Sequence, residues 1–546
     1  MFCYKCKQDS YTRLCSVSGI CAKDPSCVAV EEYLFQGLKA ISIYAKKISE
    51  YGEIPESFFK VIIRVLYTSI QNVQFDKTEI TRILEQIEFT KKELSLHYKE
   101  LLSKKGFNFE FMESPSFWDA NYNINEATKL GERLIAKRSQ TYDQNFISLL
   151  EVLMIALKGI IKNVIQAKYL GIENPKVKKF FYNTIFSLTK DLNKDDLINL
   201  ILESGKINLI AVEDLERGLE SRYGTYERIK VKTSTKTGPA ILVSGRDIRD
   251  LENILKFTEA KNINIYTHGE MLLAHTLPEL RKFKNLAGHY GGVSTDQQLE
   301  IESFPGPVLI TSNCAWNPPQ VFRGRIFTTG VPIWMGVKQI INHDYTPLVN
   351  AALDSEGFKE EEKEEKFTEV GFDIEKFENY MKKIKEGIEK NLIKHVFLVV
   401  GCSSSSLKMD YIQEFSDSIP DDTIVINFAG KQECTHCGEI NGVPKVLDFG
   451  LYNDLFFVLK FFENGGKITP DGKNDKKFSI VFFLRDQTAI SVLLSVCAIA
   501  SQINSIKIDS CMPSIISPAT FKSLDDNFGI KKTKTPKEDI EDFMQA

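Results

Sequence analysis

The stretch 240-AILVSGRDIRDLENIL-255 decides the fold class, because a short apolar run in it passes through a glycine into a helical stretch. Five further apolar runs of strand length follow, and several of them end in Gly or Cys. These runs are INIYTHG (263–269), PVLITSNC (307–314), HVFLVVGC (395–402), TIVINFAG (423–430) and KFSIVFFL (477–484). Helical stretches lie between them, and this alternation is typical of parallel α/β units.

Residues that can take part in catalysis or bind metal follow several of these runs. In parallel α/β sheets, ligand sites lie beyond the carboxyl ends of the strands. His268, Glu270, Cys314 and Cys402 fall at such ends. We therefore expect the candidate site at these strand ends.

The segment before the first strand has a different period. From Val28 to Ile172 apolar residues recur at helical spacing, which predicts a helical bundle. The charged stretch Lys359–Glu369 predicts a solvated helix or linker between two α/β units. We predict a helical domain with an amino-terminal cysteine loop over residues 1–225 and α/β domains over 226–372 and 373–546.

Composition excludes some partners. The 69 basic and 73 acidic residues give a net charge of −4, which offers no basic surface for nucleic acid. The longest uncharged run, Thr488–Ile506, is interrupted by serines and amides. It predicts a buried helix running into a loop, and no membrane span.

Cysteine usage indicates a reduced compartment. No secretory leader pattern precedes Cys3, and seven of the eleven cysteines are scattered over the long chain. This usage is typical of an intracellular protein with free thiols, and we expect a cytoplasmic location.

The other four cysteines, Cys3, Cys6, Cys15 and Cys21, lie together at the start of the chain. A Cys-x2-Cys pair can chelate one metal ion, and two later thiols can complete a tetrahedral set. Composition alone favours zinc, but this spacing fits neither the usual zinc pattern nor the common ferredoxin patterns. Four unrelated buried thiols are a third interpretation.

The spacing resembles that of the hybrid-cluster proteins, also called prismane proteins or hydroxylamine reductases, in the form with a [4Fe–4S] cluster in this loop. Further motifs resemble that family in order along essentially the whole chain. They are VSGRDIRDLENIL (243–255), YTHGEMLLAH (266–275), GHYGG (288–292), GPVLITSNC (306–314), TTGV (328–331), FLVVGC (397–402), GVPKVLDFGLYND (442–454), RDQTAISVLL (485–494) and MPSIISPATF (512–521).

The resemblance implies a helical domain followed by two Rossmann-like α/β domains, similar to carbon monoxide dehydrogenase. It also implies an enzyme that reduces hydroxylamine or nitric oxide with electrons from a redox partner protein. Cys3, Cys6, Cys15 and Cys21 would hold the [4Fe–4S] cluster. The helical domain is large enough to carry a homodimer contact.

The family also holds a hybrid iron–sulfur–oxygen cluster at a second site, and this sequence matches its ligands unevenly. Glu270, Cys314 and Cys402 stand at ligand positions, and Cys402 would carry a persulfide. The departures are Arg246 for a histidine, Gly430 or Lys431 for a cysteine, Tyr452 for a cysteine, Asp486 for a glutamate and Thr488 for a lysine. Of these replacements, Asp486 is a plausible ligand, one methylene shorter than glutamate.

These departures are chemically severe. Arg246 stays protonated and has no lone pair, so it cannot ligate iron. We therefore expect Arg246 to bind Glu270 or Asp486 as an ion pair, with the Tyr452 ring filling vacated volume. Two interpretations of Cys434 and Cys437 stay open, a plain loop pair or a partly rebuilt site.

Three functions follow from the sequence. The first is a reductase, and the second is an electron-transfer or redox-sensing protein that keeps only the [4Fe–4S] cluster. The third is a non-catalytic scaffold. His268 is expected to orient a neighbouring loop by hydrogen bonding and not to ligate metal.

Overall fold

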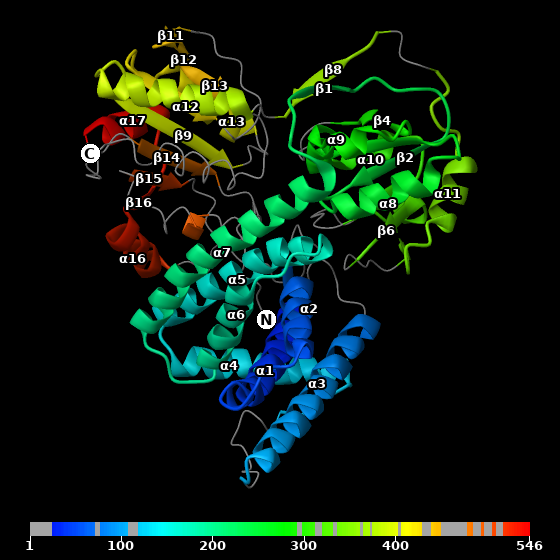
Figure 1. Cartoon of the computed structure of the whole chain (residues 1–546), viewed down its shortest axis with the longest axis vertical. Coiled ribbons are helices and arrows are strands. Elements are labelled where there is room, and N and C mark those ends of the chain that lie inside the picture. The colour runs from blue at the N-terminus through cyan, green and yellow to red at the C-terminus, as the bar shows by residue number, and fades with distance from the viewer. Residues whose placement is uncertain are drawn as a thin grey trace.

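The computed structural model describes residues 25–70, 77–107, 118–291, 297–311, 319–330, 336–360, 364–371, 374–401, 406–427, 438–448, 478–483, 493–495, 505–508 and 517–545. In Figure 1 a helical part lies below two α/β parts, which stand side by side above it. The predicted class, a helical domain followed by two α/β domains, is confirmed.

Seven helices build the helical part. They are α1 (Pro25–Ile48), α2 (Glu56–Ile70), α3 (Lys77–Lys104), α4 (Ile124–Thr141), α5 (Gln144–Tyr169), α6 (Pro175–Ser187) and α7 (Lys194–Tyr223). Helix α5 is apolar around most of its circumference, so it lies at the centre of this part. It begins at Asp143, whose side chain accepts hydrogen bonds from the backbone N–H groups of Asn145 and Phe146.

Helices α1 and α4 approach each other closely at a glycine. A Cβ atom built on Gly131 would lie 1.8 Å from the backbone carbonyl oxygen of Ala29. Only a residue without a side chain allows these two backbones to pack at this distance.

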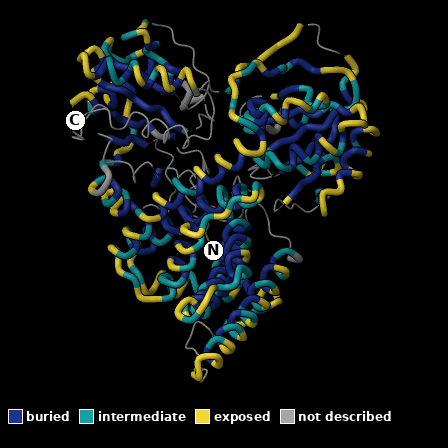
Figure 2. The backbone as a smooth tube through the Cα atoms, in the orientation of Figure 1, coloured by how far each residue is buried: buried dark blue, intermediate teal, exposed yellow. Residues whose placement is uncertain are grey.

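The first α/β part is a six-stranded parallel sheet with the order β4-β3-β2-β5-β6-β7. Its strands are β2 (Ala240–Ser244), β3 (Asn264–His268), β4 (Leu286–His289), β5 (Val308–Ile310), β6 (Ile326–Thr328) and β7 (Lys338–Gln339). The connecting elements are α8 (Ile248–Thr258), η1 (Gly269–Thr276), α9 (Pro278–Arg281), α10 (Gln297–Ser303) and η2 (Gln320–Arg325), and α11 (Thr346–Leu353) follows β7. Figure 2 shows the strands buried beneath more exposed helices.

The second α/β part repeats this plan with the strand order β13-β10-β9-β14-β15-β16, again parallel. Its strands are β9 (His395–Gly401), β10 (Thr423–Asn427), β13 (Val446–Asp448), β14 (Phe478–Phe483), β15 (Ser505–Ile508) and β16 (Ile530–Lys532). Its helices include α12 (Ile374–Glu389), α13 (Ser406–Asp417), α16 (Pro518–Phe528) and α17 (Pro536–Gln545), and β11 (Glu439–Ile440) pairs with β12 (Val443–Pro444).

Two sequence expectations need correction here. The charged stretch Lys359–Glu369 ends in a strand, because β8 (Phe367–Val370) pairs antiparallel with β1 (Ile229–Lys232). The ion pair Arg228–Glu369 lies beside this pairing. The run Thr488–Ile506 ends in strand β15 and not in a loop. Among the described residues, no helix has the length and apolar character to cross a membrane.

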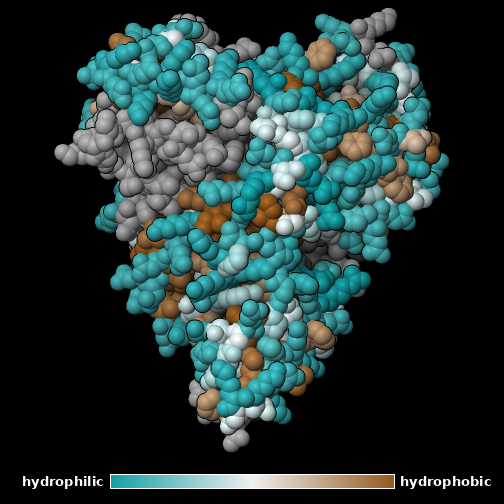
Figure 3. All heavy atoms as spheres, in the orientation of Figure 1, coloured by the Kyte–Doolittle hydropathy of each residue, from teal (hydrophilic) through white to brown (hydrophobic). Residues whose placement is uncertain are grey.

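Polar contacts tie the second α/β part to the helical part. Ser517, the N-cap of α16, donates its backbone N–H to Ser148 Oγ and its hydroxyl to Asn145 Oδ1. Asn208 of α7 donates to Ser495 Oγ at 2.9 Å. On the face drawn in Figure 3 the surface is largely hydrophilic, and hydrophobic residues gather near the middle, below the α/β parts.

Gly131→Ala should lower the free energy of unfolding by about 1–3 kcal/mol, because the added methyl group forces α1 and α4 apart. The helix propensity gained by alanine offsets only part of this loss. Denaturant unfolding measures the change. Gly324→Ala is the control, since a Cβ at Gly324 would meet no heavy atom within 4 Å, and an equal loss in both variants would contradict the proposed close approach.

Candidate functional site

Each of the two sheets has a reversal of strand order, at which parallel α/β proteins bind ligands. In the first sheet the chain starts at β2, adds β3 and β4 on one side, and then adds β5 on the other side. The crevice beyond the carboxyl ends of β2 and β5 is therefore the favoured ligand position. Arg246 follows β2 and Glu270 follows β3.

The second sheet has the same reversal between β9 and β14. Cys402 directly follows β9, and Asp486 comes shortly after β14 in the chain. Both residues lie outside the described part of the chain, as does Cys314. The other predicted positions that lie outside it are Cys3, Cys6, Cys15, Cys21, Gly430, Lys431, Cys434, Cys437, Tyr452 and Thr488.

Arg246 and Glu270 form an ion pair, as the sequence predicts. Arg246 donates from Nη2 to Glu270 Oε1 at 2.5 Å, and its Nε contacts Glu270 Oε2. This two-point geometry is the strong form of a guanidinium–carboxylate interaction. Both side chains are mostly buried, with exposed fractions of 20% and 17%.

Two glycine turns position the segments that carry Arg246 and Glu270. Gly245, with φ of 121°, turns the chain between β2 and α8, and Gly269, with φ of 60°, turns it after β3. Helix α8 begins at Asp247, whose carboxylate accepts hydrogen bonds from the backbone of Arg249 and Asp250. Burial raises the pKa of both Asp247 and Asp250, and their mutual repulsion adds to the shift for Asp247.

A second contact joins the last residues of β2 and β3, from which the two loops leave. Ser244 Oγ lies 3.0 Å from His268 Nδ1, and His268 Nε2 lies 2.8 Å from Glu300 Oε2 of α10. A carboxylate only accepts, so Nε2 donates to Glu300, and in a neutral ring Nδ1 accepts from Ser244. His268 thus acts by hydrogen bonding, as the sequence predicts, but its partners lie in strand β2 and helix α10 and not in a loop.

The order Ser–His–Glu resembles a hydrolase triad, but burial excludes that chemistry. The exposed fractions of Ser244 and His268 are 3% and 1%. An acyl substrate needs access to the serine oxygen. We therefore interpret Ser244, His268 and Glu300 as groups that hold the loops in place.

A third group fixes the segment η1 that carries Glu270. Thr267 Oγ1 lies 2.8 Å from His275 Nε2 and 2.9 Å from His289 Nδ1. Burial lowers the pKa of His275 to about 4 and that of His289 to about 3. Both rings are therefore neutral near pH 7.

Sequence reasoning missed this group and Glu300. Thr267 and His275 lie in the motif YTHGEMLLAH and His289 in GHYGG, so the signal was present in motifs already noted. Their contacts depend on how η1 packs against β4, which periodicity does not define.

Buried charges lie along α1, the first described helix after the amino-terminal cysteines. Glu31 contacts Lys158 at 3.4 Å, and Arg138 pairs with Glu32 and Glu151 at 2.9 and 3.1 Å. As small apolar residues, Cys27, Cys497 and Cys511 are expected in core or near-core positions. Cys27 is buried, as expected, and Cys497 and Cys511 lie outside the described residues.

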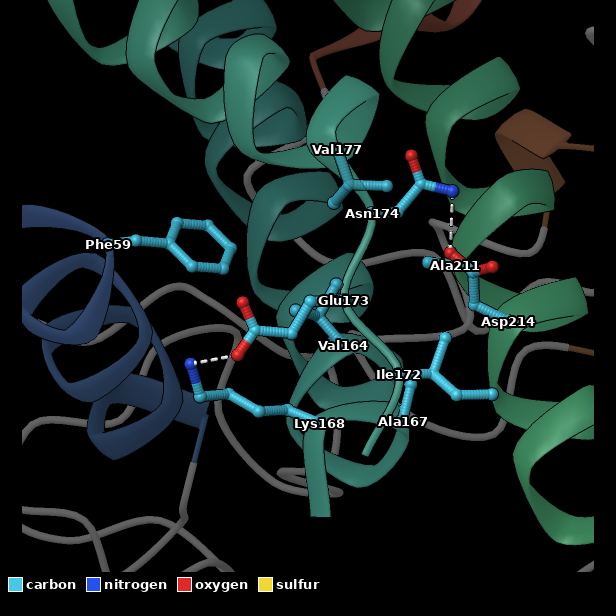
Figure 4. Close-up of a pocket in the computed structure, with 10 residues that line it drawn as sticks. All are labelled: Phe59, Val164, Ala167, Lys168, Ile172, Glu173, Asn174, Val177, Ala211 and Asp214. Atoms are coloured by element: carbon cyan, nitrogen blue, oxygen red, sulfur yellow. Dashed lines mark hydrogen bonds and ion pairs between the residues drawn. The ribbon is translucent and has the colours of Figure 1, made fainter. Parts of the chain in front are cut away.

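One hollow, drawn in Figure 4, lies among α2, α5, α6 and α7. It is shallow and partly open to solvent, and it is lined by Phe59, Val164, Ala167, Lys168, Ile172, Glu173, Asn174, Val177, Ala211 and Asp214. Its charged groups bind one another, since Lys168 pairs with Glu173 at 2.6 Å and Asn174 donates to Asp214 at 2.8 Å. Its lining contains none of the predicted site residues.

Comparison with known proteins decides the family. The sequence matches the Prismane/CO dehydrogenase family over residues 1–541. The chain belongs to this family. It is 34% identical to the "Hydroxylamine reductase" of Thermodesulfovibrio yellowstonii and 32% identical to that of Methanocella arvoryzae, with 100% of each chain covered. It is thus an iron–sulfur redox protein of the Prismane/CO dehydrogenase family.

Solved structures show a more distant likeness. Alpha subunits of acetyl-CoA synthase/carbon monoxide dehydrogenase match 99% of this chain and 86% of theirs, with a TM-score of 0.49 and 10% identity. The carbon monoxide dehydrogenase from Thermococcus sp. AM4 matches 99% of this chain and 90% of its own, with a TM-score of 0.46 and 14% identity.

Arg246→Met should lower the free energy of unfolding by about 1–3 kcal/mol, because the partly buried Glu270 carboxylate loses its guanidinium. In a double-mutant cycle with Glu270→Gln, the loss in the double variant should be smaller than the sum of the single losses. The control is Arg228→Met, whose pair with Glu369 is about half exposed and should contribute at most about 1 kcal/mol. Equal losses for Arg246→Met and Arg228→Met would argue against the pair.

Acid should destabilise the protein through His275 and His289. Their folded pKa values lie below the ordinary value of about 6.5, so their contribution is complete above that pH and is lost as pH falls toward 4 and 3. Between about pH 6.5 and pH 4 both rings contribute, and together they should make the free energy of unfolding fall by about 2.7 kcal/mol per pH unit of acidification. Urea unfolding at several pH values should show about half that slope for His289→Asn. His343→Asn, at a side chain that is 54% exposed, should leave the slope unchanged.

Proposed function

We propose that the chain is a cytoplasmic iron–sulfur redox protein that receives electrons at a [4Fe–4S] cluster held by Cys3, Cys6, Cys15 and Cys21. The observation that carries the proposal is the spacing of these four thiols at the start of a chain that matches hydroxylamine reductases along its whole length. Thiolates are the ligands that such clusters need. A bound cluster of this kind stores and passes on one electron.

A redox partner protein would supply the electrons, and a homodimer is compatible with the size of the helical part. As a reductase, the chain would act on hydroxylamine, which takes up two electrons and two protons to give ammonia and water. Nitric oxide is the second small nitrogen compound that such a protein would reduce.

The reductase step would depend on Glu270, Cys314 and Cys402, which occupy ligand positions of the second site. We expect hydroxylamine reduction to be very weak or absent, because five other positions of this site carry residues that differ in charge, softness or size. The Arg246–Glu270 ion pair favours the alternative function, electron transfer or redox sensing without catalysis.

Anaerobic purification should give a brown protein with about four irons and acid-labile sulfides per chain. Cys6→Ala should lose the colour and most of the iron, since the cluster loses one of its four thiolates. Cys27→Ala is the control, because this buried thiol lies in α1 and should not affect iron content.

A colourless protein that binds one zinc per chain would refute the iron–sulfur proposal. Hydroxylamine turnover at a rate typical of the family, abolished by Cys402→Ala, would show that the second site still works and that the reductase is the correct function.

A further inference from the structure

We propose that the Arg246–Glu270 ion pair takes the place of metal at the second site, with the guanidinium as a permanent positive charge supplied by the protein. This inference deepens the proposed function and rests on its family assignment. It does not depend on whether the amino-terminal cluster forms.

At the second site, the two described residues, Arg246 and Glu270, do not fit the family's cluster. A guanidinium has five N–H donors and no lone pair, so Arg246 cannot replace an imidazole as a ligand. Its two-point contact with Glu270 uses both oxygens of the one described carboxylate at a predicted ligand position. A metal cation could bind Glu270 only after displacing the Arg246 guanidinium. It would then lie beside that positive charge.

The pair is fixed by the backbone on both sides. Ser244 and His268 are register partners at the ends of β2 and β3, and their side chains are hydrogen-bonded to each other. Arg246 and Glu270 stand two residues further along the same two segments. The ion pair therefore continues the cross-links of the strand pair beyond the sheet.

Further contacts prevent the two loops from moving apart. Glu300 holds His268 at 2.8 Å, and the backbone N–H of Asp247 donates to Thr311 Oγ1 at 3.2 Å. On the other face of the sheet, Thr267 bonds to His275 and His289. These contacts hold the two segments that carry Arg246 and Glu270 in place beside each other.

The test separates this site from the amino-terminal cluster. The wild-type chain and Cys6→Ala are loaded anaerobically with ferrous iron and sulfide, and bound iron is counted. We expect about four irons in the wild-type chain and almost none in Cys6→Ala. We also expect ferrous iron to leave the thermal midpoint of Cys6→Ala unchanged within about 1 °C, because a cation that does not bind the folded state cannot stabilise it.

The proposal is overturned if Cys6→Ala retains about four irons that are lost when Glu270→Gln is added. It is also overturned if ferrous iron raises the midpoint of Cys6→Ala but not that of Cys6→Ala with Glu270→Gln. Absence of iron from both the wild-type chain and Cys6→Ala would refute the amino-terminal cluster and support a metal-free second site. The two proposals therefore fail by different results.

Discussion

A parallel sheet must bury both of its faces, and this constraint arranges the rest of the protein. Strands such as β2 and β9 are apolar along their length, because helices and the adjoining parts cover them on both sides. Polar chemistry is thereby confined to the loops at the strand ends. Each predicted position of the second site comes after a strand in the chain. Of these positions the described residues include Arg246 and Glu270, and the parallel pairing of β2 with β3 brings these two together.

Charge balance supports the proposal that the Arg246–Glu270 pair takes the place of metal at the second site. Carboxylates that face one another in a half-buried crevice need a cation, and a guanidinium supplies one with directed hydrogen bonds. Once that cation is present, a second one is repelled, since two unit charges 4 Å apart interact by about 4 kcal/mol at an effective dielectric constant of 20. The nearby histidines His275 and His289 stay neutral and add no further charge. The crevice is thus arranged to hold one ion pair.

The sequence predicts the fold class because apolar runs and glycines mark the strand ends, and it predicts the Arg246–Glu270 pair because the resemblance to the hybrid-cluster proteins puts both residues at ligand positions of one site. It does not predict strand β8, since a stretch rich in Glu and Lys carries no strand signal and pairs with β1 only when the chain brings them together. The sequence also does not predict the contact of Glu300 with His268. It spans 32 residues and depends on where α10 packs. Periodicity defines elements, whereas contacts between elements depend on packing.

The two halves of the proposed function differ in how they depend on the fold. The four amino-terminal thiols lie within 19 consecutive residues, Cys3–Cys21, so a cluster there needs only a local loop. The second site needs ligands from several strand ends of two separate sheets, each placed correctly relative to the others. Loss of one ligand from a distributed site removes a bond that no neighbour in sequence can replace. Electron uptake can therefore survive changes that end catalysis, while the sheets, whose cores are closed by apolar side chains, keep their structure.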